Sequence, residues 1–349
     1  MAIKLGIIGF GGMGSWHADA VKKVDGVEAY AVYDIDPERV AAAREKGLKG
    51  YDDLASFLAD DEINLVLVAT PNDVHCELVC AALNAGKHTI CEKPVAMNVA
   101  ELDQMIATAE KNGKIFSVHQ NRRWDKDFVT AKTVYDSGDL GKVYAIQSRL
   151  HGTGGIMHGW RGEKAHGGGM LYDWGVHFFD QIYNMVGYDN IVSVKCTTQS
   201  IKNEEIDDYF HATIDTKQGI GVVVEIGTFV LREQRVWSIL GDQGSMFIDD
   251  FAANGEIIKI NSMIEHVPVI LQTSAGPTRT FAPRPKEVKE TKALPECNPD
   301  WVEYYANIRD VLEGKTDDLI VKPWQVRKVL RLIECCFESA ATGKLVAVE

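Results

Sequence analysis

The first third of the chain alternates short apolar runs with segments of helical spacing. The apolar runs cover residues 3–9, 27–33, 65–69, 88–91 and 115–118, and helical stretches follow the first four. Continuous apolar strands without polar alternation are typical of a parallel sheet that is covered on both faces. Repeated strand–helix units of this kind predict an α/β fold with a doubly wound parallel sheet.

The pattern changes after about residue 120. A helix is predicted over 125–137, a strand over 143–150 and a mostly apolar helix over 169–186. Longer alternating runs then cover residues 191–200, 208–216, 219–228, 235–241 and 244–249. Such alternation indicates a large, mostly antiparallel open sheet with one face exposed.

The last part of the chain is predicted to be irregular and then helical. Four prolines between residues 273 and 296 indicate an irregular connection, and helices are expected near 299–313 and 323–341. We therefore predict two domains. Residues 1–120 form the parallel-sheet domain, and residues 121–349 form an α+β domain for substrate binding and oligomerisation, whose last helix can pack back on the first domain.

Composition narrows the class of protein. The chain has 349 residues, more than one ordinary core holds, and 46% of them are hydrophobic and 25% charged. A net charge of −13 without a basic stripe argues against nucleic acid as a partner. No apolar run reaches membrane-spanning length, no signal-peptide pattern is present, and seven cysteines without a C-x-x-C spacing favour reduced thiols. These features predict a cytoplasmic protein without a membrane partner.

A glycine-rich loop follows the first apolar run. Gly9, Gly11 and Gly14 form a G-x-G-x-x-G pattern that opens a helix, and Asp34 ends the second apolar run. This combination is the dinucleotide-binding fingerprint of a Rossmann domain, with the pyrophosphate at the helix N-terminus. Asp34 would accept hydrogen bonds from the ribose and repel a 2′-phosphate, so NAD is expected rather than NADP, although Arg39 keeps NADP open. The loop residues expected to contact the cofactor are Gly9, Gly11, Gly12, Met13 and Gly14.

The apolar helix 169–186 carries ionisable residues. Asp173 and His177 are four residues apart and share one helix face. Buried ionisable groups are costly unless they are paired or used, so this pair is a candidate catalytic pair. Asp180 is expected to be solvated or to act as a cap.

Three segments together resemble the Gfo/Idh/MocA family of oxidoreductases, which includes glucose–fructose oxidoreductase and inositol dehydrogenases. They are "ATPNDVH" at 69–75, "CEKPVA" at 91–96 and "GGGMLYDWGVHFFD" at 167–180. The resemblance covers the whole chain. It implies that Lys93, Asp173 and His177 surround the reacting carbinol carbon, and that the C-terminal sheet joins copies into a homodimer or homotetramer.

The same resemblance assigns further binding residues. Beyond the glycine loop and Asp34, the implied cofactor contacts are Ala69, Thr70, Pro71, Asn72, His75, Glu92, Lys93, Gln120, Asn121, Trp160 and Arg161. The implied or candidate substrate contacts are Lys93, Arg122, His151, Tyr172, Asp173 and His177.

Elementary chemistry supports the catalytic set. A neutral imidazole can take the hydroxyl proton of an alcohol near pH 7, so His177 is the expected base in oxidation and acid in reduction. Lys93 would bond the substrate oxygen and stabilise developing alkoxide, and Asp173 would orient the substrate or fix the imidazole tautomer. If burial lowers the pKa of Lys93, that residue can join the proton transfer.

No metal is expected. Hydride transfer needs none, and His151, His158, His166 and His177 are spaced by seven, eight and eleven residues, which matches no compact ligand motif. Contacts to substrate hydroxyls are the favoured role, although a metal bound by histidines within 151–166 stays open.

The expected function is an NAD-dependent dehydrogenase that acts on a small sugar, polyol or glycoside. Two alternatives remain. One is a redox-neutral enzyme that retains NAD and oxidises its substrate transiently, and the other is a non-catalytic sensor of cofactor and sugar.

Overall fold

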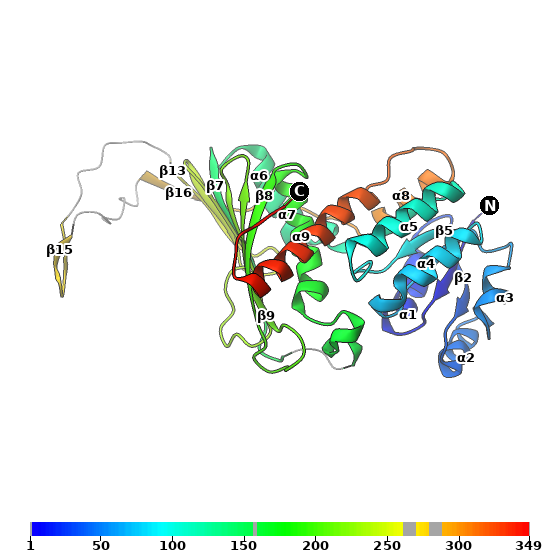
Figure 1. Ribbon diagram of the computed structural model, residues 1–349. Coiled ribbons are helices and arrows are strands. Elements are labelled where there is room, and N and C mark those ends of the chain that lie inside the picture. Colours follow the sequence, from blue (N-terminus) through cyan, green and yellow to red (C-terminus); the bar gives the residue numbers. More distant parts are fainter. Residues whose placement is uncertain (1, 156–158, 261–269, 279–287, 349) are drawn as a thin grey trace.

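The computed structural model describes residues 2–155, 159–260, 270–278 and 288–348. Two large sheets lie next to each other, the first built from the N-terminal third of the chain and the second from its middle (Figure 1). A separate hairpin of β14 (Leu271–Thr273) and β15 (Gly276–Thr278) lies apart from both sheets. Within these ranges no helix is both long and apolar enough to cross a membrane.

The first sheet confirms the predicted doubly wound parallel architecture. Its six strands are all parallel and run in the order β3-β2-β1-β4-β5-β6. The strands are β1 (Ile3–Ile8), β2 (Val27–Tyr33), β3 (Lys49–Tyr51), β4 (Leu65–Val68), β5 (His88–Cys91) and β6 (Phe116–Val118). The helices between them are α1 (Gly12–Ala20), α2 (Pro37–Glu45), α3 (Leu54–Leu58), α4 (His75–Asn84) and α5 (Val99–Asn112). The short β3 and α3 were not predicted, because β3 contains no apolar run.

Glycines and a helix cap determine the turns that follow β1 and β2. Gly9 has a φ of +91°, and a Cβ there would lie 2.6 Å from the carbonyl oxygen of Ala69. A Cβ on Gly14 would lie 2.0 Å from the carbonyl oxygen of Gly9, so only glycine lets α1 approach β1 this closely. The Asp36-Pro37 pair in the sequence predicts the start of a helix with Asp36 as its N-cap. At the start of α2, the Asp36 carboxylate accordingly accepts a hydrogen bond of 2.9 Å from the main-chain N–H of Glu38.

The second sheet is mixed but mostly antiparallel. Its nine strands run in the order β16-β13-β12-β11-β7-β10-β9-β8-β17, and only the central β7–β10 pair is parallel. The predicted strands are present as β7 (Val143–His151), β8 (Ile191–Gln199), β9 (Tyr209–Thr216), β10 (Gly221–Gly227), β11 (Trp237–Gly241) and β12 (Gly244–Ile248). Three more strands were not predicted, namely β13 (Gly255–Ile260), β16 (Lys289–Lys292) and β17 (Val346–Ala347). The expectation of an irregular connection over 273–296 is therefore wrong where β15 and β16 form.

The α-helices of the rest of the described chain are α6 (Lys126–Ser137), α7 (Val176–Val186), α8 (Val302–Leu312) and α9 (Pro323–Thr342). Figure 1 shows α7 and α9 on the side of the second sheet that faces the first. The α9 helix places Leu330 in the core of the first sheet and Leu332 in the core of the second. The α8 helix adds Tyr304 and Tyr305 to the first core. The domain division at residue 120 stays a prediction.

One buried acid next to the second core, Asp127 on α6, has no ion pair with any residue that the structure describes. Its Oδ2 accepts a hydrogen bond of 2.9 Å from the indole N–H of Trp237, while its Oδ1 is buried without a hydrogen-bond partner among the same residues. Burial raises the pKa of this carboxyl to about 7. The folded protein therefore holds this proton more tightly than the unfolded chain, so this group makes folding less favourable as the pH rises from about 4 to about 7.

We expect Asp127→Asn to raise the free energy of unfolding at pH 8 by about 1–2 kcal/mol, because the amide keeps an acceptor for Trp237 and carries no charge to desolvate. Near pH 4 the wild-type carboxyl is protonated in the folded state, so most of the difference should disappear. Urea unfolding at the two pH values measures the effect. An equal change at both would contradict a buried charge as its cause.

Candidate active site

A cavity of about 540 Å³ lies at the carboxyl ends of β1, β2, β4 and β5. This is the edge at which open α/β sheets bind their ligands. The predicted cofactor residues that line it are Gly9, Gly11, Gly12, Met13, Asp34, Ala69, Thr70, Pro71, Glu92, Lys93, Trp160 and Arg161. The lining residues that the sequence reading did not assign are Ile8, Tyr33, Ile35, Val74, Glu77 and Leu78. Of these, only Ile35 has a signal in the sequence, since it is an apolar residue that directly follows Asp34. Its side chain is 89% exposed at the cavity.

Asp34 joins the glycine loop to the end of β2. Its Oδ2 accepts a hydrogen bond of 2.6 Å from the N–H of Phe10, and its Oδ1 accepts one of 2.9 Å from the N–H of Asp36. Arg39 also lines the cavity, and its Nη1 lies 3.4 Å from Asp34 Oδ2. A carboxylate and a guanidinium therefore lie together where the dinucleotide fingerprint places the adenosine ribose.

Lys93 and Asp173 meet across the two sheets. Lys93 follows β5, and its Nζ donates to the Oδ1 of Asp173 at 3.0 Å and to the main-chain oxygen of Asp173 at 2.9 Å. The Nε of Arg161 lies 3.6 Å from the same Oδ1. Asp173 itself lies in a π-helical turn, Leu171–Gly175, which precedes α7 where a plain α-helix was expected. Such turns are frequent at functional sites.

His177 lies on the first turn of α7 and is 3% exposed. Its Nδ1 is buried and has no hydrogen-bond partner among the described residues. Burial, followed by the charges of Lys93 and Arg122, holds the pKa of this imidazole well below its ordinary value. The ring is therefore neutral at pH 7 and can accept a proton.

Arg122 is held next to His177. Its guanidinium stacks on the ring of Trp174 at 4.1 Å, and its Nη1 donates to the carboxylate of Asp125 at 2.8 Å. Trp174 in turn contacts the His177 ring edge to face, with a centroid distance of 5.8 Å. The indole of Trp174 therefore contacts both the Arg122 guanidinium and the His177 imidazole.

Several buried polar atoms in this region lack a hydrogen-bond partner within the described ranges. They are Thr70 Oγ1, Asn72 Oδ1, both amide atoms of Gln120, Arg161 Nε and His177 Nδ1. Buried polar groups in proteins are nearly always hydrogen-bonded, so this group of atoms indicates a polar ligand. Gly11 and Gly12 have only a distant Arg39 atom or open space where a Cβ would stand, which suits close approach of a pyrophosphate. The residues present therefore fit a dinucleotide.

Some predicted contacts lie elsewhere. The two ring nitrogens of His75 bond the main-chain oxygens of Pro94 and Thr70, so this side chain is occupied structurally. Tyr172 donates its hydroxyl to the main-chain oxygen of Met97 at 2.6 Å, and His151 lies near Glu225 on the second sheet. The predicted cofactor contact of His75 and the predicted substrate contacts of Tyr172 and His151 stay predictions. The remaining predicted cofactor residues outside the cavity lining are Gly14, Asn72, Gln120 and Asn121.

Within the described residues, His151 and His166 from the candidate metal-binding histidines have separate partners. His166 pairs with Asp73 at 3.0 Å, while His151 lies 3.7 Å from Glu225. His158 falls outside the described residues.

Asp180 requires a correction. The expectation of a solvated or capping role is wrong, because Asp180 is 1% exposed and binds Arg123 through two hydrogen bonds of 2.7 Å. Arg123 also donates to the main-chain oxygen of Ile320 and to the side chain of Gln325. This ion pair fixes α7 to the turn that carries Arg122 and to the beginning of α9.

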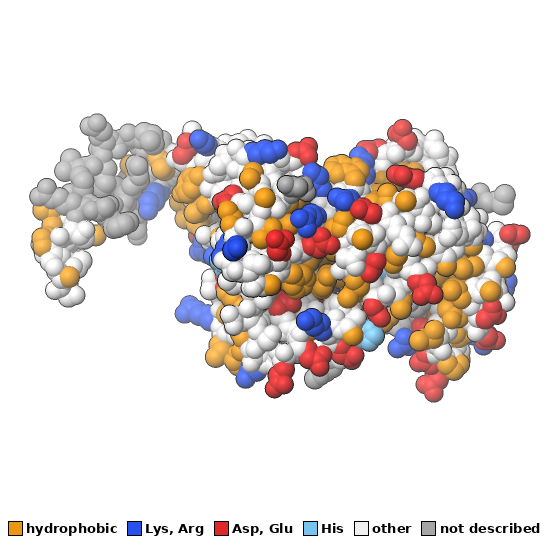
Figure 2. Space-filling view, viewed as in Figure 1, with side chains coloured by type: hydrophobic (Ala, Val, Ile, Leu, Met, Phe, Trp, Pro, Cys, Tyr) orange, Lys and Arg blue, Asp and Glu red, His pale blue; other side chains and the backbone are white. Residues whose placement is uncertain are grey.

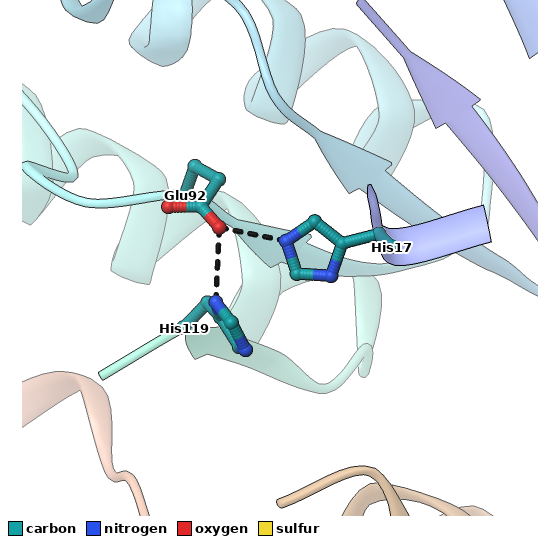
Figure 3. Close-up of side chains that lie close together, drawn as sticks. All are labelled: His17, Glu92 and His119. Atoms are coloured by element: carbon teal, nitrogen blue, oxygen red, sulfur yellow. Dashed lines mark hydrogen bonds and ion pairs between the residues drawn. The ribbon is translucent and has the colours of Figure 1, made fainter. Parts of the chain in front are cut away.

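The sequence reading also missed a buried trio around Glu92. His17 from α1 and His119 after β6 both contact its carboxylate (Figure 3). Side chains of these types can hold a metal ion, but the nitrogen–oxygen distances of 2.7 and 2.9 Å are those of hydrogen bonds. No local motif could have found them, because the three residues are brought together only by the fold.

Comparison with known proteins gives matches along most of the chain. Residues 3–120 match a family described as "Oxidoreductase family, NAD-binding Rossmann fold", and residues 128–247 match the "GFO/IDH/MocA C-terminal domain". The scyllo-inositol 2-dehydrogenase (NADP(+)) of Bacillus subtilis is 28% identical, over 99% of this chain and 96% of its own. The myo-inositol 2-dehydrogenase of Thermotoga maritima is 30% identical, over 71% of this chain and 75% of its own. A solved NAD-binding protein from Listeria innocua has a TM-score of 0.89 and 38% identity, covering 99% of this chain and 97% of its own.

Proposed function

We propose, since this chain belongs to the Gfo/Idh/MocA family of NAD(P)-binding oxidoreductases, that it moves a hydride between NAD and a carbinol carbon of a sugar, polyol or glycoside. One observation carries this proposal. Lys93 and Asp173 are bonded at 3.0 Å, Lys93 lines the cofactor cavity, and the charge of Lys93 acts on the neutral His177. A proton acceptor and a cationic donor therefore stand together at one end of a dinucleotide cavity.

The three residues have distinct proposed roles. Lys93 uses two of its N–H groups on Asp173, which leaves one to bond a substrate oxygen and stabilise developing negative charge. His177, being neutral, takes the hydroxyl proton in oxidation and returns it in reduction. Asp173 holds the Lys93 ammonium in place. The bound nicotinamide supplies the hydride acceptor or donor.

The substrate class rests on the surface beside these residues and on the relatives. Trp174 offers an apolar ring face, and Arg122 offers N–H donors, which together suit a polyhydroxylated ring. Two relatives are named as inositol dehydrogenases, which makes cyclic polyols the first compounds to test. We also propose that the enzyme works in the cytoplasm as a homodimer or homotetramer joined through the second sheet.

Acidic and basic side chains are interspersed on the surface of the molecule, as Figure 2 shows for the viewed face. The net charge of −13 remains unfavourable for binding a polyanion. This supports a small molecule, rather than nucleic acid, as the partner.

Asp34 should decide between the two cofactors. We expect kcat/KM for NAD to exceed that for NADP by about tenfold or more, because the Asp34 carboxylate would repel a 2′-phosphate. Asp34→Asn removes the charge and keeps one oxygen acceptor, so the ratio of kcat/KM for NAD to that for NADP should fall several-fold. Initial rates with each cofactor measure it.

Arg39→Ala serves as the matched control, because it removes the neighbouring cation and should weaken NADP more than NAD. A wild-type preference for NADP would overturn the role assigned to Asp34.

The proposed function is tested by two measurements on the purified protein. Mass spectrometry of nucleotide released on denaturation shows whether a cofactor is retained, and absorbance at about 340 nm follows its reduction by inositols, sugars and glycosides. Turnover with exchange of cofactor supports the dehydrogenase. Stoichiometric retained NAD together with chemistry that consumes no cofactor would support the redox-neutral alternative. Binding without turnover of any substrate in the panel would favour the sensor and oppose the proposal.

A further inference from the structure

A buried polar cluster surrounds Glu92, the residue before Lys93. His17 comes from α1, His119 follows β6 and Tyr305 comes from α8. All four side chains of the cluster belong to residues that are at most 5% exposed. Burying this many polar groups is costly unless each is satisfied, so the hydrogen bonds between them carry information about their charge states.

The hydrogen bonds define one arrangement of protons. Glu92 Oε1 lies 2.7 Å from His17 Nε2 and 2.9 Å from His119 Nδ1 (Figure 3). An ionised carboxylate is an acceptor only, so both nitrogens donate to it. His17 Nδ1 then accepts from the hydroxyl of Tyr305, at 2.6 Å. Glu92 Oε2 accepts from the main-chain N–H of Lys93 at 3.0 Å, which ties the cluster to the turn that carries Lys93.

With one proton on each imidazole, as this hydrogen-bond arrangement requires at the Glu92 carboxylate, the cluster carries a net negative charge. Burial alone would raise the pKa of the Glu92 carboxyl, but the His119 and His17 imidazoles together hold it well below its ordinary value. Burial lowers the pKa of His17 to about 4, so His17 is neutral at pH 7. The Nε2 of His119 is buried without a hydrogen-bond partner in the described part of the chain. A proton on that atom would be a buried donor without an acceptor, which costs free energy.

This charge is not cancelled by a nearby cation. Among the described residues the ion-pair contacts of the Glu92 carboxylate, within 4.0 Å, are to His17 and His119 alone. The Lys93 ammonium is bonded instead to Asp173 at 3.0 Å. Glu92 nevertheless lines the cofactor cavity at its Lys93 end. A full negative charge in such surroundings acts strongly on any charge bound close to it.

We propose that His17 and His119 are positioning residues that hold Glu92 as a fixed negative charge, and that this charge makes the protein bind the oxidised, positively charged nicotinamide more tightly than the reduced, neutral ring. The inference rests on the proposed function, because it requires the nicotinamide at the Lys93 end of the cavity. It concerns the relative affinity of the protein for the two redox forms of the cofactor, and not the rate of hydride transfer.

The test compares dissociation constants for NAD⁺ and NADH, by calorimetry without substrate. For wild type the ratio Kd(NADH)/Kd(NAD⁺) is expected to be high, and Glu92→Gln should lower it by about tenfold. His119→Phe removes one donor and should lower the ratio part of the way. His119→Gln, which keeps an N–H donor, should retain more of it.

Glu110→Gln is the matched control, because it removes one carboxylate from the exposed surface of α5 and should leave the ratio unchanged. A general loss of folding would weaken the binding of NAD⁺ and NADH together. Only a change in the ratio of their dissociation constants therefore reports the charge of Glu92. Thermal melting of each variant identifies any that fail to fold, and Glu92→Gln, being isosteric, keeps the inference testable in that case.

The outcomes separate the two proposals. A wild-type protein that binds neither NAD(H) nor NADP(H) contradicts the proposed function itself. A wild type that binds both redox forms, with the same ratio in Glu92→Gln, overturns the role of the cluster and leaves the proposed function intact.

Discussion

Replacing Lys93 with methionine is expected to lower kcat by about 10²–10³-fold. Methionine has a similar length but no N–H donor and no charge, so the developing alkoxide loses its stabilising partner. The loss should appear mainly in kcat, because a donor directed at developing charge acts more strongly in the transition state than on bound substrate. Steady-state kinetics with the best substrate of the screen measure the effect.

Two further variants show whether the loss of kcat comes from a missing catalytic group or from a disturbed structure. Lys93→Met leaves the buried Asp173 without its 3.0 Å partner, which could itself disturb the site. Adding Asp173→Asn removes the charge that has lost its lysine partner, and it should restore stability but not turnover. Lys111→Met, on the exposed end of α5, is the control for the substitution type. Recovery of full activity in the double variant would mean that the pair is only structural.

Substitution of His177 by asparagine should lower kcat in the oxidation direction by about 10²–10⁴-fold, the usual range for a lost general base. The pH profile adds a second readout. Because burial and the neighbouring cations depress the pKa of His177 well below its ordinary value, the wild-type ring stays neutral at pH 7–8. His177 should therefore cause no loss of the oxidation rate in that range, whereas the residual rate of His177→Asn should rise as hydroxide replaces the base.

The control for this variant is His211→Asn, which makes the same change on β9 of the second sheet. It should leave both the rate and the pH profile unaltered. A His177→Asn enzyme with wild-type kcat would remove His177 from the catalytic set and transfer the proton-accepting role to Lys93.

The sequence predicted most of the first sheet, since its information is local. Apolar runs such as "LVLV" at β4 need no distant partner to be identified, and Gly9, Gly14 and Asp34 lie within one strand–helix–strand unit. The Asp36 cap was equally local. The same reasoning paired Asp173 with His177 on one α-helical face, but Asp173 lies in the π-helical turn Leu171–Gly175, so this pairing stays a prediction.

What the sequence could not predict depends on contacts between distant residues. Tyr305 and His17 are 288 positions apart, and the Arg123–Asp180 pair joins residues 57 positions apart. Asp180 was misread because its helix position does not reveal a buried guanidinium opposite. The parallel pairing of β7 with β10 was also hidden, because side-chain alternation indicates an exposed face but not strand direction.

The helices near the C-terminus have a consequence for how the protein unfolds. The core of the first sheet includes Tyr304 and Tyr305 from α8 and Leu330 from α9, while Leu332, two positions further, belongs to the second core. Loss of either core exposes apolar surface on the same helix, so the two sheets share one cooperative unit and not two independent ones. The hydroxyl of Tyr305 also bonds His17, so the last part of the chain to be synthesised completes the surroundings of Glu92. The cofactor site is therefore expected to mature only after α8 has been synthesised and has packed on the first sheet.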